Sequence, residues 1–314
     1  MGTPEFAVGT LRALVEGGYQ VVGVVTQPDK PVGRHQDMLR PSEVKQYALA
    51  HGIPVLQPVK MKDPVFLEAL SAWKADLQVV VAFRMLPEVV WAMPRFGTFN
   101  VHAALLPQYR GAAPINWAVI NGETLTGVTT FFLDKDIDTG RVILQKPFPI
   151  PDDADVEYVY DGLMHLGAEA AIETVDRIIE GNGTTASMPQ SDMVATTGEL
   201  KPAPKIFKDT CHIDFSLKAK QVYDFVRGLS PYPGAWAEMP STDGKPAGVV
   251  KIFRTAKTGK ALASEVPGTV TTAQGRILVA CADEWLEIEE LQLAGKKRME
   301  AKAFLNGNQL NELR

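Results

Sequence analysis

The chain has 314 residues, a length typical of two domains rather than one. Hydrophobic residues make up 46% of it and charged residues 22%, which is typical of a globular protein with enough apolar material to bury a core. No apolar run reaches the roughly 18 residues needed to cross a bilayer, the N-terminus lacks a signal-peptide pattern, and the two cysteines, Cys211 and Cys281, form no CxxC motif. We therefore predict a cytoplasmic protein with reduced thiols and no membrane partner.

The net charge of −5 is divided unevenly along the chain. Residues 201–314 hold 17 Lys and Arg against 13 Asp and Glu, a net charge of +4. Residues 1–200 hold 15 Lys and Arg against 24 Asp and Glu, a net charge of −9. A basic C-terminal third favours a polyanionic partner for that part alone, although an imbalance of this size is also typical of solvated surface.

The first 150 residues alternate helical patterns with continuous apolar runs. The first helical pattern begins after Thr3 and ends at Gly17, and Ser42 begins the second. The sequence predicts helices over 4–16, 42–51, 63–73 and 156–181, and strands over 19–27, 76–83, 97–102, 126–134 and 141–150. Runs of β-branched and aromatic residues suit strands buried on both faces. The alternation predicts a doubly wound, mostly parallel, Rossmann-like α/β domain over residues 1–185.

The N-terminus departs from that pattern. A parallel α/β domain normally opens with a strand, whereas this chain opens at a helix cap. We expect the first strand of the sheet to be missing at the N-terminus, with a gap beside residues 20–26.

The stretch that follows the last predicted helix is poor in apolar side chains and contains GNGTT (181–185) and KPAPK (201–205), a composition typical of a linker, which we place at 186–206. The pattern then changes to a short helix followed by strands separated by Gly, Pro and Asp turns, which predicts a small β-barrel domain over 207–314. The helix is predicted over 217–228, and the strands over 235–239, 248–256, 268–273, 275–282 and 285–293.

Several familiar sites are excluded by the motifs. The chain has no GxGxxG, no P-loop and no GxSxG. The stretch DKDIDTG (134–140) opens like a calcium loop, but it has Thr139 where such loops have Gly and Gln145 where they have Glu. Two cysteines and five scattered histidines do not form a zinc pattern, so we expect no metal.

A polar pair stands at the end of the third predicted strand. Asn100 and His102 are two residues apart, so they lie on one face, at the strand end where open α/β sheets bind ligands. An amide supplies a donor for a developing oxyanion, an imidazole moves a proton near neutral pH, and an Asp at 134, 136 or 138 can orient the imidazole. These groups suit acyl transfer, although Asn and His at a strand end also commonly serve as turn and cap residues.

Six stretches carry a resemblance to a known family. The chain resembles the 10-formyltetrahydrofolate-dependent formyltransferases, in particular the methionyl-tRNA formyltransferases, in GTPEFA (2–7), TQPDKPVGR (26–34), NVHAALLPQYRGAAPI (100–115), TGVTTFFLDKDIDTG (126–140), LSPYPGAWAE (229–238) and LQLAGKKRM (291–299). The resemblance implies transfer of a formyl group from 10-formyltetrahydrofolate to the α-amine of methionyl initiator tRNA. It also implies that Asn100 stabilises the oxyanion, that His102 moves the proton and that Asp138 orients His102.

The resemblance extends to the folate site. Ala104, Leu105, Leu106 and Pro107 stand where the family usually has Ser-Leu-Leu-Pro and are expected to contact the folate. Ala104 brings no hydroxyl, so contacts there would be apolar or through the backbone.

The resemblance also implies contacts with tRNA. Loop 27–42, with Arg34, would contact the acceptor end, and the C-terminal domain would be an OB-like barrel with Lys296, Lys297 and Arg298 at phosphates. An ordinary βα loop and solvent-facing lysines are the alternatives. We expect a monomer. Other functions left open are a sugar-nucleotide N-formyltransferase, a 10-formyltetrahydrofolate hydrolase and a catalytically silent RNA-binding protein.

Overall fold

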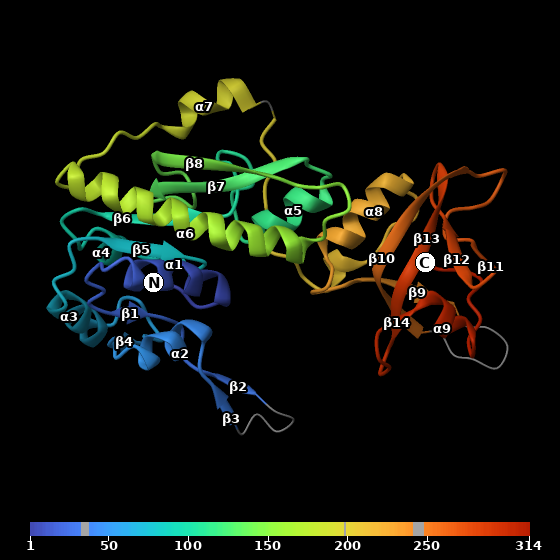
Figure 1. Ribbon diagram of the computed structural model, residues 1–314, viewed down its shortest axis with the longest axis horizontal. Helices are drawn as coiled ribbons and strands as arrows, with labels where there is room; N and C mark the ends of the chain where they lie inside the picture. Colours follow the sequence, from blue (N-terminus) through green and yellow to red (C-terminus); the bar gives the residue numbers. More distant parts are fainter. Residues whose placement is uncertain (33–37, 198, 241–247) are drawn as a thin grey trace. The chain divides into compact units, whose positions relative to one another are not determined.

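The computed structural model describes residues 1–32, 38–197, 199–240 and 248–314. These residues divide into two compact units (Figure 1). The first unit contains Met1–Gly111, Leu125–Pro149 and Tyr160–Pro202, and the second contains Ala112–Thr124, Ile150–Val159 and Ala203–Arg314. Among the described residues, no helix is both long and apolar enough to cross a membrane.

The first unit is built on a four-stranded sheet in the order β5-β6-β7-β8, formed by β5 (Gln78–Val81), β6 (Thr98–His102), β7 (Leu125–Phe132) and β8 (Val142–Pro149). β5 and β6 are parallel, whereas β7 is antiparallel to both β6 and β8. β7 and β8 run in opposite directions because the short loop at 133–141 joins them, and parallel neighbours need a longer crossover. The predicted α/β class is confirmed, with a sheet of mixed strand direction.

A second strand pair in this unit is parallel and shorter than the sequence predicts. It consists of β1 (Val24–Val25) and β4 (Val55–Leu56), although the apolar run predicted a strand over 19–27. Met1 and Gly2 lie between β1 and β5, where the Gly2 amide donates to Val25 O (3.0 Å) and the Val81 amide donates to Met1 O (2.9 Å). Residues 19–23 line a cavity of about 560 Å³ instead of pairing in a ladder, so the strand is confined to two residues.

Two helices of this unit begin at side-chain caps, whereas α1 begins after Pro4 with no cap bond from a side chain. The Ser42 hydroxyl accepts from the Lys45 amide at 3.1 Å and the Asp63 carboxylate accepts from the Val65 amide at 3.0 Å. These helices are α1 (Glu5–Glu16), α2 (Glu43–Ala50), α3 (Pro64–Ala72) and α4 (Glu88–Trp91). Two regions predicted as loop or linker also carry regular structure: β2 (Lys30–Val32) pairs with β3 (Met38–Arg40), and α7 spans Gln190–Thr197.

Helix α6 (Val156–Glu180) runs along one face of the four-stranded sheet (Figure 1). The Thr174 hydroxyl on α6 is 2.7 Å from that of Thr130 on β7. A Cβ at Gly162 would lie 2.2 Å from the ring of Phe148 on β8, so only glycine allows this approach. α6 therefore covers the face that carries Thr130 and Phe148, and the opposite face is left for the side chains that alternate with them.

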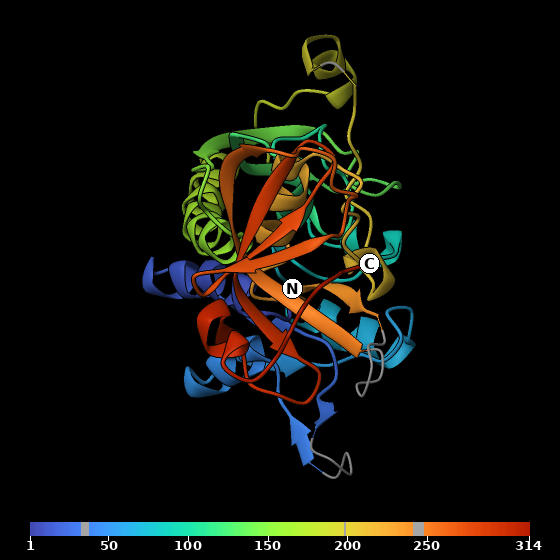
Figure 2. The same cartoon turned by 90° about the vertical axis from the view of Figure 1, so that its right-hand side faces the viewer.

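The second unit carries an antiparallel sheet in the order β11-β12-β13-β10-β9, with β14 paired to β13 (Figure 2). The described strands show no ladder between β9 and β11, the two ends of this order, so no closed barrel is formed by strand pairing. The predicted strands are present, although β10 continues to Ala261, beyond its predicted end at 256. The elements are α5 (Pro114–Ile120), a 3-10 turn at Asp209–Cys211, α8 (Ala219–Gly228), β9 (Ala235–Met239), β10 (Gly248–Ala261), β11 (Val270–Ala273), β12 (Arg276–Ala280), β13 (Glu284–Leu293), β14 (Met299–Glu300) and α9 (Ala301–Leu305).

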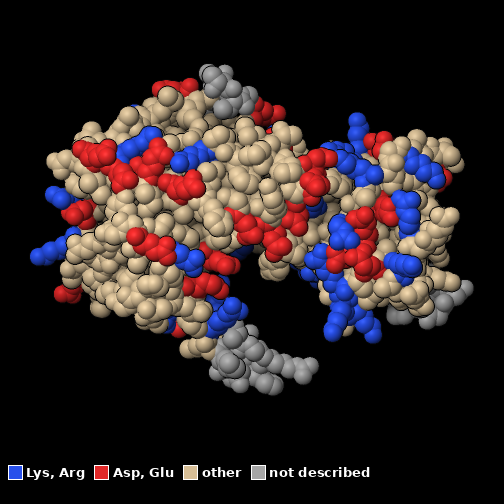
Figure 3. Space-filling view, in the orientation of Figure 1, with Lys and Arg blue, Asp and Glu red and all other residues tan. Residues whose placement is uncertain are grey.

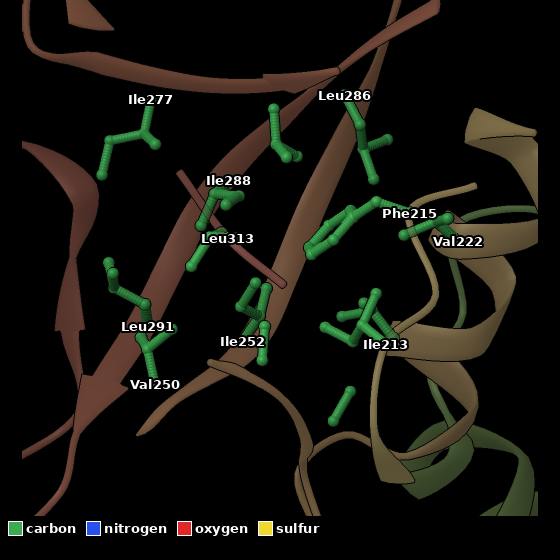
Figure 4. Close-up of a cluster of buried hydrophobic side chains, with 14 of the residues drawn as sticks. Ile213, Phe215, Val222, Val250, Ile252, Ile277, Leu286, Ile288, Leu291 and Leu313 are labelled. Carbon is green, nitrogen blue, oxygen red and sulfur yellow. The ribbon is translucent and has the colours of Figure 1, made fainter. Parts of the chain in front are cut away.

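Aliphatic side chains from the strands and from α8 point toward one another and form the core of this unit (Figure 4). Ile252 on β10, Ile288 on β13 and Val222 on α8 are each at most 1% exposed. Burying such a side chain stabilises the fold by roughly 1.5–3 kcal/mol, so the core holds the sheet and α8 together as one body.

Candidate active site

Strand β6 places Asn100 and His102 on the sheet face opposite α6. In the antiparallel register, Asn100 lies across from Phe131 and His102 lies across from Thr129. Val101, which lies between Asn100 and His102, faces α6, where a Cβ at Gly167 would lie 3.3 Å from it. The predicted pairing of the amide and the imidazole on one strand face is therefore present.

His102 is buried, with 6% of its surface exposed. Its Nε2 lies 2.9 Å from the carbonyl oxygen of Tyr109. A carbonyl only accepts, so Nε2 carries a hydrogen, and in the neutral ring Nδ1 is left as the acceptor. Nδ1 faces Asp138, whose Oδ2 is 3.8 Å away, which is longer than a hydrogen bond by roughly 1 Å.

The loop between β7 and β8 brings only one of three aspartates to the imidazole. The Asp138 carboxylate is largely buried, and its Oδ2 accepts from the Gly111 amide at 3.0 Å. Asp134 instead accepts from the Asp136 amide (3.2 Å) and from the Thr139 hydroxyl (2.7 Å) within its own loop, and the Asp136 side chain is exposed. The structure thus brings Asp138 to His102 and leaves the other two aspartates in the turn.

The Asn100 amide has no hydrogen-bond partner among the described residues, and its Oδ1 is buried. An unsatisfied buried polar atom costs roughly 1–3 kcal/mol, so such an atom in a native protein calls for an explanation. Oδ1 is an acceptor, so an N–H or O–H donor on an external ligand at this face would supply its missing partner. The N–H groups of the same amide are the donors that could serve a developing oxyanion.

The segment Ala104–Pro107 follows directly and is tied to the sheet through its backbone. The Thr129 hydroxyl donates to Ala104 O (2.6 Å) and accepts from the Leu106 amide (3.0 Å). Gln145 on β8 donates to Leu106 O (2.7 Å). The side chains of Ala104, Leu106 and Pro107 are buried, and Leu105 is half-buried.

Sequence reasoning did not identify Thr129 and Gln145 as part of the site. The register places Thr129 beside His102 on β6 and beside Gln145 on β8, so the three residues form one row across the sheet.

The residues expected to contact tRNA differ in how exposed they are and in whether the protein itself binds them. Arg34 lies outside the described residues. Lys296 and Lys297 are exposed at the turn between β13 and β14. Arg298 is engaged by the protein itself, because its Nη2 lies 2.6 Å from the Glu290 carboxylate and its guanidinium lies 4.4 Å from the centre of the Phe253 ring. Figure 3 shows that basic side chains of the second unit are interspersed with acidic ones.

The two thiols do not form an activated nucleophile. Burial, followed by the nearby Asp283 charge, raises the pKa of the Cys281 thiol to about 12. Burial also raises the pKa of Cys211. Because the thiolate is the reactive form, burial disfavours nucleophilic chemistry at both cysteines. Among the described residues, no group of three or more His, Cys, Asp or Glu side chains is arranged to hold a metal ion.

A parallel strand that ends in an amide and an imidazole, with a carboxylate facing the imidazole, defines an α/β enzyme suited to acyl transfer. Comparison with known proteins agrees with this class: residues 1–175 match the formyl transferase family model and residues 205–309 match the formyl transferase C-terminal domain. A methionyl-tRNA formyltransferase from Parabacteroides distasonis is 60% identical over 98% of this chain and 94% of its own length. A methionyl-tRNA formyltransferase from Bacteroides fragilis is 58% identical over 99% of this chain and 95% of its own length. The chain belongs to the methionyl-tRNA formyltransferase family.

A solved structure shows the same fold at low identity. The N-formyltransferase from Helicobacter canadensis, in complex with folinic acid and dTDP-3-aminofucose, is similar with a TM-score of 0.62. The identity is 18%, and the match covers 91% of this chain and 96% of that one. This similarity extends to the architecture of both units.

Proposed function

We propose that the protein transfers the formyl group of 10-formyltetrahydrofolate to the α-amino group of methionyl initiator tRNA and that it acts in the cytoplasm, where translation starts. The observation that carries the proposal is the arrangement of Asn100, His102 and Asp138 at one strand end. The chain that holds it is 46–60% identical to relatives named methionyl-tRNA formyltransferase.

The geometry supports a role for each of the three groups. The amine of the aminoacyl-tRNA attacks the formyl carbon, and the resulting oxyanion takes its hydrogen bond from the N–H of the Asn100 side chain. Asn100 Oδ1, which is buried and has no partner among the described residues, would accept from an N–H of the substrate. The proton of the amine passes to His102 Nδ1, since Nε2 is occupied by Tyr109 O. The Asp138 carboxylate, 3.8 Å from Nδ1, stabilises the imidazolium, which then returns the proton to the departing folate nitrogen.

The remaining assignments follow the same proposal. Ala104–Pro107 would contact the folate through half-buried Leu105 and backbone groups, because the Ala104 and Leu106 side chains are buried. The second unit would bind tRNA in the manner of an OB-like domain, with Lys296 and Lys297 at phosphates. Arg298 would contribute only if it exchanged Glu290 for a phosphate. Arg34 would serve the acceptor end, and a monomer would suffice, since all three catalytic groups come from one chain.

One experiment tests this function against its alternatives. The protein is incubated with 10-formyltetrahydrofolate and either methionyl initiator tRNA, a dTDP-amino sugar or neither, and formylated product and free formate are measured. Formylmethionyl-tRNA as the dominant product supports the proposal. Formylated sugar identifies a sugar N-formyltransferase, formate without acceptor identifies a hydrolase, and no turnover with tRNA binding identifies a silent RNA-binding protein.

A further inference from the structure

Gln190, the first residue of α7, uses its whole side-chain amide in the interior of the first unit. It is 2% exposed. Its Oε1 accepts from Arg110 Nε (3.0 Å) and Nη2 (2.7 Å), and its Nε2 donates to Asp138 O (2.8 Å) and Gly140 O (2.9 Å). A guanidinium only donates and carbonyls only accept, so the orientation of the amide is determined by its partners.

The two carbonyls that Gln190 binds belong to the loop that carries the catalytic carboxylate. Asp138 has a φ of +55°, in the left-handed region that a residue with a side chain adopts at a cost of roughly 1–2 kcal/mol. Gly140 lies so close to β7 that a Cβ there would be 1.6 Å from Phe132 O. A backbone in this conformation needs surrounding contacts to hold it, and the Gln190 amide supplies two of them.

Arg110, which donates to Gln190, belongs to the segment that follows β6. Arg110 lies between Tyr109, whose carbonyl binds His102 Nε2, and Gly111, whose amide donates to Asp138 Oδ2. One amide therefore holds the loop that carries Asp138 and also holds the segment that contacts both His102 and Asp138.

Gln190 is itself anchored through the residues that precede it, at the point where the loop that carries Asp138 joins β8. Met188 and Val142, the first residue of β8, exchange two backbone hydrogen bonds of 2.8 Å. Arg141 binds the carbonyl of Ser187 (2.6 Å) and its hydroxyl (2.9 Å). The position of the amide is thus set by the sheet, and the amide can impose that position on the loops.

We propose that Gln190 is a positioning residue for formyl transfer, acting through Asp138: it sets the distance between the Asp138 carboxylate and His102 Nδ1 by holding the two loops on either side. This inference rests on the proposed function. It goes beyond that function by assigning a role to a residue that does not touch the reacting atoms.

Two variants separate the two halves of the amide. Gln190→Met keeps the length of the side chain and removes all four hydrogen bonds. Gln190→Glu keeps an acceptor for Arg110 but turns a carboxylate oxygen toward two carbonyls. We expect both to lower kcat about tenfold or more, with the KM values for folate and tRNA within about twofold of the parent, because positioning is lost rather than uniform binding. An unchanged kcat in Gln190→Met, or parent activity in Gln190→Glu, would overturn the proposal.

A control and a double-mutant cycle distinguish positioning from general destabilisation. Thr174→Val removes a buried hydroxyl on the α6 side of the sheet, and it should lower Tm while leaving kcat unchanged. In an Asp138→Ala background, adding Gln190→Met should lower kcat by less than about twofold further, because the effect of Gln190 passes through Asp138. Full additivity of the two losses would show that Gln190 acts by another route.

A readout independent of turnover keeps the inference testable if the proposed function fails. Amide hydrogen exchange at Gly111 should accelerate in Gln190→Met and stay unchanged in Thr174→Val, because the Gly111 amide is protected by its bond to Asp138 Oδ2. Absence of formyl transfer by the parent enzyme would contradict the proposed function alone. Unchanged Gly111 exchange in Gln190→Met would contradict the positioning role alone.

Discussion

Thr129 lies directly across from His102 in the β6–β7 pairing, and its hydroxyl binds the chain on both sides of Leu105. It donates to Ala104 O and accepts from the Leu106 amide, and Gln145 adds a donor at 3.0 Å. One side chain on the strand next to the imidazole thus holds the segment expected to contact folate.

Thr129→Val, which keeps the shape of the side chain, should raise the KM for 10-formyltetrahydrofolate about threefold to tenfold. The reason is that the Ala104–Leu106 backbone loses two partners and must be ordered by the folate itself. The KM for tRNA should not change. Steady-state kinetics with each substrate varied in turn measures both. Thr130→Val, on the α6 face of the same strand, is the control, and equal folate KM values for the two variants would contradict this assignment.

Removing any one of the three groups proposed for catalysis should abolish most of the activity. Asn100→Ala, His102→Ala and Asp138→Ala should each lower kcat about a hundredfold or more, because each removes charge stabilisation or proton transfer in the transition state. Circular dichroism checks that the variants fold.

The neighbouring aspartates provide controls for these variants. Asp136→Ala should stay within about twofold of the parent, since its side chain is exposed. Asp134→Ala should lose a little more, because Asp134 binds Thr139 and the Asp136 amide in the same loop. Parent activity in Asp138→Ala would show that another group stabilises the imidazolium.

The turn between β13 and β14 holds Lys296, Lys297 and Arg298, and we expect the two lysines to act in tRNA binding and the arginine in stability. Replacing Lys296 and Lys297 together with Ala should raise the KM for tRNA several-fold and leave Tm unchanged. The slope of log KM for tRNA against log salt concentration should fall by about 1–2, because fewer phosphate contacts form and fewer counterions are released on binding. Kinetics across a salt series measures the slope. The matched control is Lys60→Ala with Lys62→Ala, two exposed lysines of the first unit. An equal slope in the two double variants would remove the turn from the tRNA interface.

Arg298→Ala should behave differently from the lysine variants. It removes an ion pair with Glu290 and a cation–π contact with Phe253, so it should lower Tm by a few degrees, roughly 2–4 °C. Thermal unfolding followed by circular dichroism measures this. A Tm equal to that of the parent would mean that Arg298 is free to serve a phosphate.

The second unit should show a pH-dependent stability at Asp152. Hydrogen bonds from Lys257 and then Lys220 lower the pKa of the Asp152 carboxyl. A folded-state pKa below the unfolded value contributes stability that is present above the unfolded pKa and is lost as the pH falls through the folded one.

Asp152→Asn should therefore lower Tm by about 1–3 °C at pH 7, a small effect because the group is solvent-screened. The difference between variant and parent should shrink as the pH falls below about 4. Thermal unfolding from pH 3 to 8 measures it. Asp136→Asn, whose carboxyl is exposed, is the control, and a pH-independent difference for Asp152→Asn would contradict the ionic origin.

The local sequence pattern was sufficient to predict the type of most elements and the pairing of Asn100 with His102 on one strand face. Ser42 and Asp63 begin the helices where capping predicts, because a side-chain oxygen beside free N–H groups needs no tertiary partner. The pair Asn100 and His102 was predictable because the period of a strand places residues i and i+2 on one face.

Strand length and direction depended on neighbours. The apolar run at 19–27 reads as one strand, yet only Val24–Val25 pairs with β4, since a strand exists only where a partner offers a ladder. The antiparallel direction of β7 and β8 follows from the connection at 133–141, which is too short for a parallel crossover.

The sequence by itself determined the α/β class, the order of the elements and the residue types available for chemistry. The strand pattern left Asp134, Asp136 and Asp138 open as partners of His102, and the family resemblance named Asp138, which the structure places beside His102. Only the tertiary structure decided that Thr129 holds the segment after His102 and that Gln190 binds both loops. The physical reason is distance along the chain. A side chain's face is set by the dihedral angles of its own element, whereas a contact between residues 36 or 80 positions apart, such as Asp138 with His102 or Gln190 with Arg110, is set by how loops close over a packed sheet.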